Sequence, residues 1–77
     1  MPTAEAVAEW ILYFAVHKRG VDEGEVAMHG WYLQPIVDQG WTQADYQRGI
    51  ELAMERGWIE PVSEVMFRIS ASGYDRA

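Results

Sequence analysis

The stretch from Gly40 to Glu60 reads Gly-Trp-Thr-Gln-Ala-Asp-Tyr-Gln-Arg-Gly-Ile-Glu-Leu-Ala-Met-Glu-Arg-Gly-Trp-Ile-Glu. Thr42 is a favourable helix N-cap, and Asp45 follows three residues later, as in a capping box with Asp in place of Glu. Gly57 provides a helix stop before an apolar strand entry. Helical steps of 100° per residue place one set of residues on a common side, namely Tyr46, Gly49, Ile50 and Ala53. The segment therefore predicts a capped helix over 42–56 followed by a strand.

Two further helices are expected on the N-terminal side of this segment. Thr3 is a plausible N-cap and Gly20 a stop for a first helix over 4–19. Its apolar stripe at helical spacing consists of Val7, Trp10, Ile11, Phe14 and Ala15. A second helix is expected over 31–38, but Pro35 cannot donate a backbone hydrogen bond and belongs in a first turn. The second helix is therefore short, or begins close to Leu33.

The C-terminal third of the chain has the alternation of a β-hairpin. Val65, Phe67 and Ile69 alternate with more polar residues, and Pro61–Glu64 is expected to form the connecting loop. Residues 26–28 are a candidate third strand inside an otherwise loop-like segment. We therefore predict one α+β domain over 1–77, with three helices and a C-terminal antiparallel sheet of two strands, or three if 26–28 joins it.

Two motifs resemble the winged-helix superfamily, and the likeness extends over nearly the whole chain. The first is Ile50-x-x-Ala53-x-x-x-Gly57-Trp58-Ile59, which is similar to the ending of the family's third helix. The second is Phe67-Arg68-Ile69-Ser70-Ala71-Ser72-Gly73, which resembles the segment that follows the wing in many bacterial transcriptional regulators. In those regulators the glycine opens a dimerisation helix. Here only Tyr74 to Ala77 follow, so no such helix is expected.

Composition and charge restrict the classes of function. The 77 residues carry a net charge of −6, their basic residues are dispersed, and cysteine is absent. The absence of cysteine excludes disulfides and thiolate metal sites. The longest apolar run, Trp10 to Val16, is seven residues and too short to cross a membrane. We expect a cytoplasmic protein without a membrane partner.

The resemblance places the DNA-reading positions of the third helix on Gln43, Ala44, Gln47, Arg48 and Glu51. Glutamine can read adenine and arginine can read guanine, which keeps a small DNA-binding regulator as the alternative function. Acidic residues surround Arg48, however, and the expected wing tip carries Glu64 where the family usually has a base. Because phosphate neutralisation supplies much of the affinity for DNA, the charge disfavours this alternative.

The favoured interpretation is a non-catalytic module that binds another protein. Ten aromatic side chains exceed what a core of this size readily covers, and partly exposed Trp and Tyr are preferred anchors at interfaces. The candidate surface joins the acidic region of residues 22–25 and 38 to Trp31, Tyr32, Trp41, Arg48, Glu51 and Glu55. Its partner would have a basic or amphipathic surface, and the chain itself would be a monomer or a weak homodimer.

No residue pattern indicates a catalytic, metal or cofactor site. His17 and His29 lack the spacing of zinc ligands, and the serines lack a nucleophile elbow. Gly49 inside the third helix costs about 1 kcal/mol relative to alanine. We expect it to admit a close neighbouring side chain, such as a tryptophan.

Overall fold

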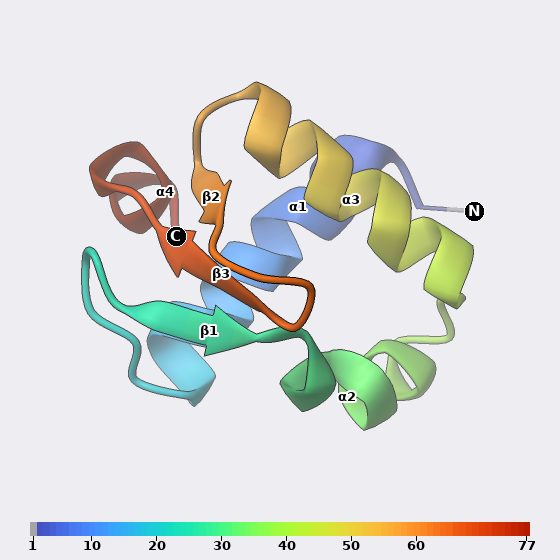
Figure 1. Cartoon of the computed structure of the whole chain (residues 1–77). Coiled ribbons are helices and arrows are strands. Elements are labelled where there is room, and N and C mark those ends of the chain that lie inside the picture. Colours follow the sequence, from blue (N-terminus) through green and yellow to red (C-terminus); the bar gives the residue numbers. More distant parts are fainter. Residues whose placement is uncertain (1) are drawn as a thin grey trace.

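The computed structural model describes residues 2–77, which form an α+β domain. Helices α1 and α3 pack against each other, and a three-stranded antiparallel sheet lies beside them (Figure 1). The elements in chain order are α1 (Ala4–Tyr13), the π-helical segment η1 (Phe14–Lys18), β1 (Val26–Met28), the 3-10 segment η2 (His29–Tyr32), α2 (Leu33–Asp38), α3 (Gln43–Glu55), β2 (Ile59–Pro61), β3 (Met66–Ile69) and α4 (Ala71–Arg76).

The sheet has the order β1-β3-β2, so β3 is its central strand. Phe67 on β3 lies opposite Ala27 on β1 and Pro61 on β2. Proline is tolerated there because β2 is an edge strand, where a missing backbone donor breaks no second ladder. The candidate third strand at 26–28 is confirmed as β1.

The capping signals of α3 are confirmed in full. The Asp45 N–H donates to Thr42 Oγ1 at 3.1 Å, and the Thr42 N–H donates to the Asp45 carboxylate at 2.9 Å. The helix begins at Gln43 and ends at Glu55, one residue inside the predicted range at each end. Gly57 then adopts a φ of 74°, which glycine reaches without steric cost.

The first helix differs from the uniform helix predicted over 4–19. Thr3 caps it as expected, but beyond Tyr13 the chain widens into the π-helical segment η1. The buried Tyr32 hydroxyl donates to the backbone carbonyl of Ile11 at 2.8 Å, one turn ahead of the widened segment. π-Helical turns occur where an extra group enters the hydrogen-bond ladder of a helix. The π-helical segment thus coincides with a contact from Tyr32, a residue distant in sequence. The local sequence does not reveal this contact.

Helix α2 is short and begins at Leu33, as Pro35 required. The prediction of three helices is wrong, because a fourth, α4, follows β3. Ser70 caps α4 by accepting from the Gly73 N–H at 3.1 Å, and its hydroxyl lies 2.9 Å from the Trp58 carbonyl oxygen. Gly73 lies against that same carbonyl, and a Cβ at this position would overlap it. Contact with Trp58 therefore orders a tail that looked too short for a helix.

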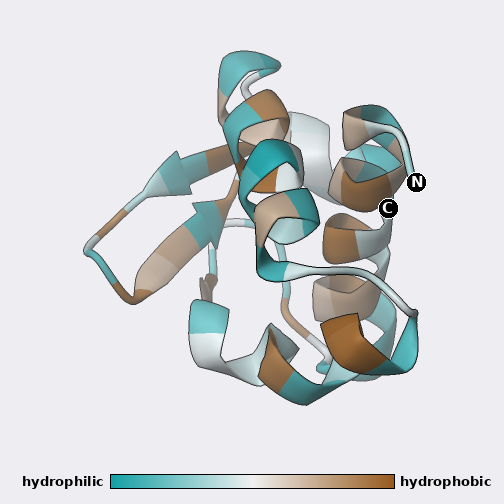
Figure 2. Ribbon diagram, turned by 90° about the vertical axis from the view of Figure 1, so that its right-hand side faces the viewer, coloured by the Kyte–Doolittle hydropathy of each residue, from teal (hydrophilic) through white to brown (hydrophobic). Residues whose placement is uncertain are grey.

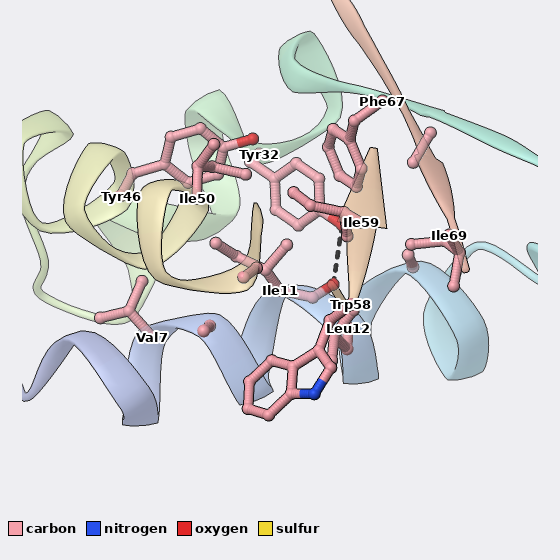
Figure 3. Close-up of a cluster of buried hydrophobic side chains, with 14 of the residues drawn as sticks. Val7, Ile11, Leu12, Tyr32, Tyr46, Ile50, Trp58, Ile59, Phe67 and Ile69 are labelled. Atoms are coloured by element: carbon pink, nitrogen blue, oxygen red, sulfur yellow. Dashed lines mark hydrogen bonds between the residues drawn. The ribbon is translucent and has the colours of Figure 1, made fainter. Parts of the chain in front are cut away.

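The core lies between α1, α3 and the inner face of the sheet (Figure 3). Its largest fully buried side chains come from six different elements: Val7, Ile11, Leu12, Tyr32, Ile36, Ile50, Ile59, Phe67 and Ile69. Gly49 is the point of closest approach of α3 to α1. The expected close neighbour is confirmed, but it is Val7 rather than a tryptophan, since a Cβ on Gly49 would lie 2.5 Å from Val7 Cγ1 and 3.1 Å from the Ala8 nitrogen.

We predict that Gly49→Ala lowers the free energy of unfolding by about 1–3 kcal/mol, because the added methyl group must push α1 and α3 apart. Urea unfolding measures the change. Gly30→Ala is the matched control, since a Cβ there meets no atom within 4 Å and its φ is not positive. A Gly49→Ala variant more stable than the parent would contradict the close packing.

We predict that Tyr32→Phe costs roughly 1–2 kcal/mol of stability, because the Ile11 carbonyl loses a buried donor while the ring is kept. Tyr74→Phe serves as the control, since the Tyr74 side chain is exposed and its change should stay within about 0.5 kcal/mol. Thermal and urea unfolding report both values. Equal stability of Tyr32→Phe and the parent would exclude a structural role for this hydroxyl.

Candidate binding surfaces

The prediction that Tyr32 belongs to an interaction surface is wrong, because its side chain is only 1% exposed. Its ring lies 5.0–5.7 Å, between centroids, from the rings of Phe14, Tyr46 and Trp10. The η2 turn directs Tyr32 into the core and leaves its neighbour Trp31 half-buried. An aromatic pair in a short segment of this kind gives no sequence signal of which ring faces inward.

The other two predicted aromatic residues are partly covered by the protein itself. Trp41 packs edge-on against Trp10, with 5.3 Å between ring centroids. The Arg19 guanidinium lies 4.4 Å from the centroid of the Trp31 ring, in a cation–π arrangement. Both tryptophans keep some exposed surface, but each already has an intramolecular partner.

A largely apolar depression lies between the C-terminal part of α1, η1 and α2. This α1–α2 groove has a volume of about 380 Å³ and is lined by Trp10, Tyr13, Phe14, Lys18, Pro35, Asp38 and Gln39. On α2, Leu33 and Val37 are 61% and 60% exposed, and their spacing of four residues places them on one side of the helix. Figure 2 shows the hydrophobic segments of α2 in brown at the bottom of the view. Sequence reasoning missed this groove because α2 was too short for a reliable assignment of faces.

A second depression lies between α3 and the loop connecting β2 to β3. This α3–loop groove measures about 410 Å³ and is lined by His29, Gln43, Tyr46, Gln47, Ile50, Met54, Ser63 and Glu64. Of the five candidate DNA-reading residues, Gln43 and Gln47 line this groove. Ala44, Arg48 and Glu51 are exposed on α3 but do not line it.

At one end of the α3–loop groove, His29 Nδ1 and the Tyr46 hydroxyl are 2.7 Å apart. The His29 ring also packs against Phe67, with 5.0 Å between ring centroids. Burial lowers the pKa of His29 and raises the pKa of Tyr46, because both charged forms would lose water. The pair is therefore neutral near pH 7 and joins η2 to α3 without a net charge.

Each of the five arginines contacts a carboxylate or an aromatic ring. Arg48 pairs with Asp45, whose pKa is lowered chiefly by the hydrogen bond from the Thr42 N–H. The remaining pairs are Arg19 over Trp31, Arg56 with Glu5 and Trp58, Arg68 with Glu60, and Arg76 with Glu9 and Trp58. Every arginine, including Arg48 on α3, therefore already has an intramolecular partner.

Three other acidic side chains, on α3 and on the loop between β2 and β3, differ from Asp45 in this respect. Within residues 2–77, Glu51, Glu55 and Glu64 form no salt bridge with a basic side chain. Of the predicted interaction surface, Arg48, Glu51 and Glu55 are exposed on α3, whereas Trp31 and Trp41 flank α2. The two depressions therefore differ in chemistry: the α1–α2 groove is apolar, and the α3–loop groove is polar with acidic surroundings.

We predict that the free energy of unfolding falls as the pH drops below about 6.5, the pKa of histidine in an unfolded chain. Because the pKa of His29 is lowered in the fold, the unfolded state binds its proton first and is favoured as the solution becomes acidic. Urea unfolding between about pH 7.5 and 5 measures the slope. His29→Gln should flatten it, and identical slopes for variant and parent would contradict the assignment.

Residues 2–77 contain no group of three or more His, Asp or Glu side chains placed to hold a metal ion. Among the same residues, no helix has the length and apolar character needed to cross a membrane. Comparison with known proteins finds no matching family model, curated protein or solved structure. The two grooves are therefore the features of the described residues on which a function can be proposed.

Proposed function

We propose that this chain is a winged-helix domain that acts as a non-catalytic module and binds another protein. The order helix, strand, helix, helix, strand, strand and the sheet order β1-β3-β2 support the winged-helix proposal. So does the resemblance of the Gly57-Trp58-Ile59 segment, whose glycine ends α3 with a positive φ. In this proposal α3 is the third helix of the family and residues 62–65 form a short wing.

The observation that favours a protein partner over DNA is that each arginine already contacts a carboxylate or an aromatic ring of the protein. Binding to DNA depends strongly on cations that neutralise phosphates. The cation on the exposed side of α3, Arg48, is paired with Asp45, while Glu51 and Glu55 on the same helix and Glu64 on the loop are not neutralised. A phosphate backbone against this face would meet uncompensated negative charge.

The apolar surface on the other side of the molecule supplies the positive argument. Contiguous exposed apolar residues on a small domain mark sites of interaction. Tyr13, which lines the aromatic α1–α2 groove, and Leu33 and Val37, which lie on another side of α2, are each more than 40% exposed. We propose this surface as the principal contact, and the net charge of −6 favours a partner with basic residues around an apolar centre.

A small DNA-binding regulator remains the second candidate because Gln43 and Gln47 line the same groove beside the loop. Glutamine pairs with the adenine edge in the major groove. This candidate requires α3 to enter the major groove of DNA despite its acidic side chains. The two candidate functions therefore make opposite predictions about DNA binding.

We predict no binding to random-sequence duplex DNA at low salt, measured by fluorescence anisotropy. A matched gain-of-charge variant, Glu51→Lys with Glu55→Lys and Glu64→Lys, should acquire binding that weakens as salt is raised, because a winged helix offers this face to the groove. Salt-dependent binding by the parent chain would favour the DNA-binding candidate. Absence of binding by the variant would count against the winged-helix placement of α3 and the loop.

A direct test of protein binding places a photo-reactive amino acid at position 37 or position 55 in cells that express the chain. We predict a discrete protein adduct at position 37 on the exposed apolar side of α2, and none at position 55 on α3. Leu33→Gln should reduce the adduct formed at position 37, since it removes apolar contact area without changing charge. Failure to form a protein adduct at either position would contradict the proposed function.

A further inference from the structure

We propose that the α3–loop groove is a binding site for a small organic cation, with the apolar body of the ligand against Ile50 and Met54 and its charged N–H group directed at the Glu64 carboxylate. The groove lies between α3 and the loop connecting β2 to β3, whereas the proposed protein contact lies on α2. A ligand site here goes beyond the proposed protein-binding function and does not depend on it.

The α3 wall of the groove is fixed by contacts with the core. Tyr46 and Ile50 line the groove and are only 7% and 2% exposed, so they form its floor. The Tyr46 hydroxyl lies 2.7 Å from His29 Nδ1, and the His29 ring packs on Phe67 of the central strand. The floor is therefore part of the core and needs no ligand to order it.

The opposite wall, the loop between β2 and β3, is held by hydrogen bonds of its own. The Val62 and Ser63 N–H groups both donate to the Met66 carbonyl oxygen, at 3.1 and 3.2 Å. The Val65 N–H donates to Ser63 Oγ at 3.2 Å. Glu64 is therefore carried by an ordered turn, and a ligand is spared much of the cost of ordering the site.

The lining of the groove combines an apolar floor with a polar rim. Ile50 and Met54 provide aliphatic and thioether surface, whereas the exposed side chains of Gln43, Gln47 and Ser63 provide oxygen acceptors at the rim. The volume of about 410 Å³ falls within the range of roughly 300–1,000 Å³ that small-molecule sites occupy. Such a lining suits a ligand that has both an apolar body and N–H donors.

The charges around the groove select a cation. Within residues 2–77, no lysine or arginine lines the groove, and the Glu64 carboxylate in its lining has no salt bridge. The neighbouring Glu51 carboxylate lies 3.5 Å from the neutral Gln47 amide and has no salt bridge either. Burial lowers the pKa of His29, so its imidazole adds no competing positive charge near pH 7. A phosphate or carboxylate ligand would meet negative charge, whereas an ammonium, amidinium or guanidinium group would neutralise it.

An organic cation fits the groove better than a metal ion. Glu64 and His29 supply the carboxylate and imidazole of the lining, and His29 Nδ1 is already hydrogen-bonded to Tyr46. Residues 2–77 place no group of three such side chains to hold a metal ion. The Ile50 side chain at the floor offers no metal ligand, but it can pack against the apolar body of an organic ligand.

The test is an NMR titration of the isotope-labelled domain with three compounds of nearly the same size and shape. Benzamidine is a cation near neutral pH, benzamide is neutral and benzoate is an anion. Benzamidine should give saturable amide shifts with a millimolar or tighter dissociation constant, concentrated on His29, α3 and residues 62–65. Benzamide should bind several-fold more weakly, and benzoate should not bind. Because the three compounds share one apolar ring, these differences report the charge selectivity of the groove.

Three variants of the domain make the outcome specific. Glu64→Gln should weaken benzamidine binding several-fold and leave benzamide binding unchanged, because it removes the carboxylate at nearly constant volume. Glu55→Gln is the charge-matched control, since Glu55 is exposed on α3 but does not line the groove. It should change the affinity little at about 0.15 M salt, where charges outside the groove are largely screened. Met54→Gln should weaken both compounds, because the ring loses apolar contact. Urea unfolding confirms that each variant keeps the fold.

Several results would overturn the proposal. These are equal binding of benzamidine and benzamide, tighter binding of benzoate, shifts confined to the α1–α2 groove, no saturable binding, or unchanged affinity of Glu64→Gln. Binding of N-acetylarginine methylamide, which mimics an arginine residue in a protein chain, but not of benzamidine would replace the small molecule by a side chain of another protein. Neither the titration nor its variants involve position 37, so failure of the cation site leaves the proposed protein binding to its own test.

Discussion

The hydrogen bond from the Tyr32 hydroxyl to the Ile11 carbonyl is the contact on which the arrangement of the domain depends. It joins the end of η2, just before α2, to the C-terminal part of α1, and it brings an aromatic ring between Phe14, Trp10 and Tyr46. Burial without this bond would leave the Tyr32 hydroxyl without a partner, so the carbonyl constrains the position of the ring. Tyr32 in this position also contacts Trp10 and Phe14, two aromatic residues that line the α1–α2 groove.

The inward position of Tyr32 also determines which side of α2 faces the core and which side faces the solvent. With Tyr32 directed inward and Ile36 following one turn later into the core, Leu33 and Val37 have to face outward. Trp10 rests on Tyr32 and cannot be fully covered by a helix as short as α2. Exposed apolar surface therefore results from the length of α2, which Pro35 and the preceding 3-10 turn limit at its N-terminal end.

Much of the fold could be predicted from sequence, because its signals are local. The Thr42 and Asp45 capping box, the Gly57 stop and the alternation around Phe67 each lie within a few residues. The features that were missed depend on distant partners. Helix α4 requires Gly73 to meet Trp58, and the pairing of Arg56 with Glu5 joins residues 51 positions apart. The candidate site was predicted least well, since the positions of Tyr32, Arg56 and Arg76 depend on contacts with distant residues.

Solvent relaxation by an inert gadolinium chelate, read at the side-chain protons by NMR, tests the central claim most directly. Tyr32 is 1% exposed and its neighbour Leu33 is 61% exposed. The account predicts strong relaxation of the Leu33 and Val37 methyl protons and protection of the Tyr32 and Phe67 ring protons. Comparable relaxation of Tyr32 and Leu33, or protection of both α2 methyl groups, would contradict an inward Tyr32 with an outward apolar surface beside it.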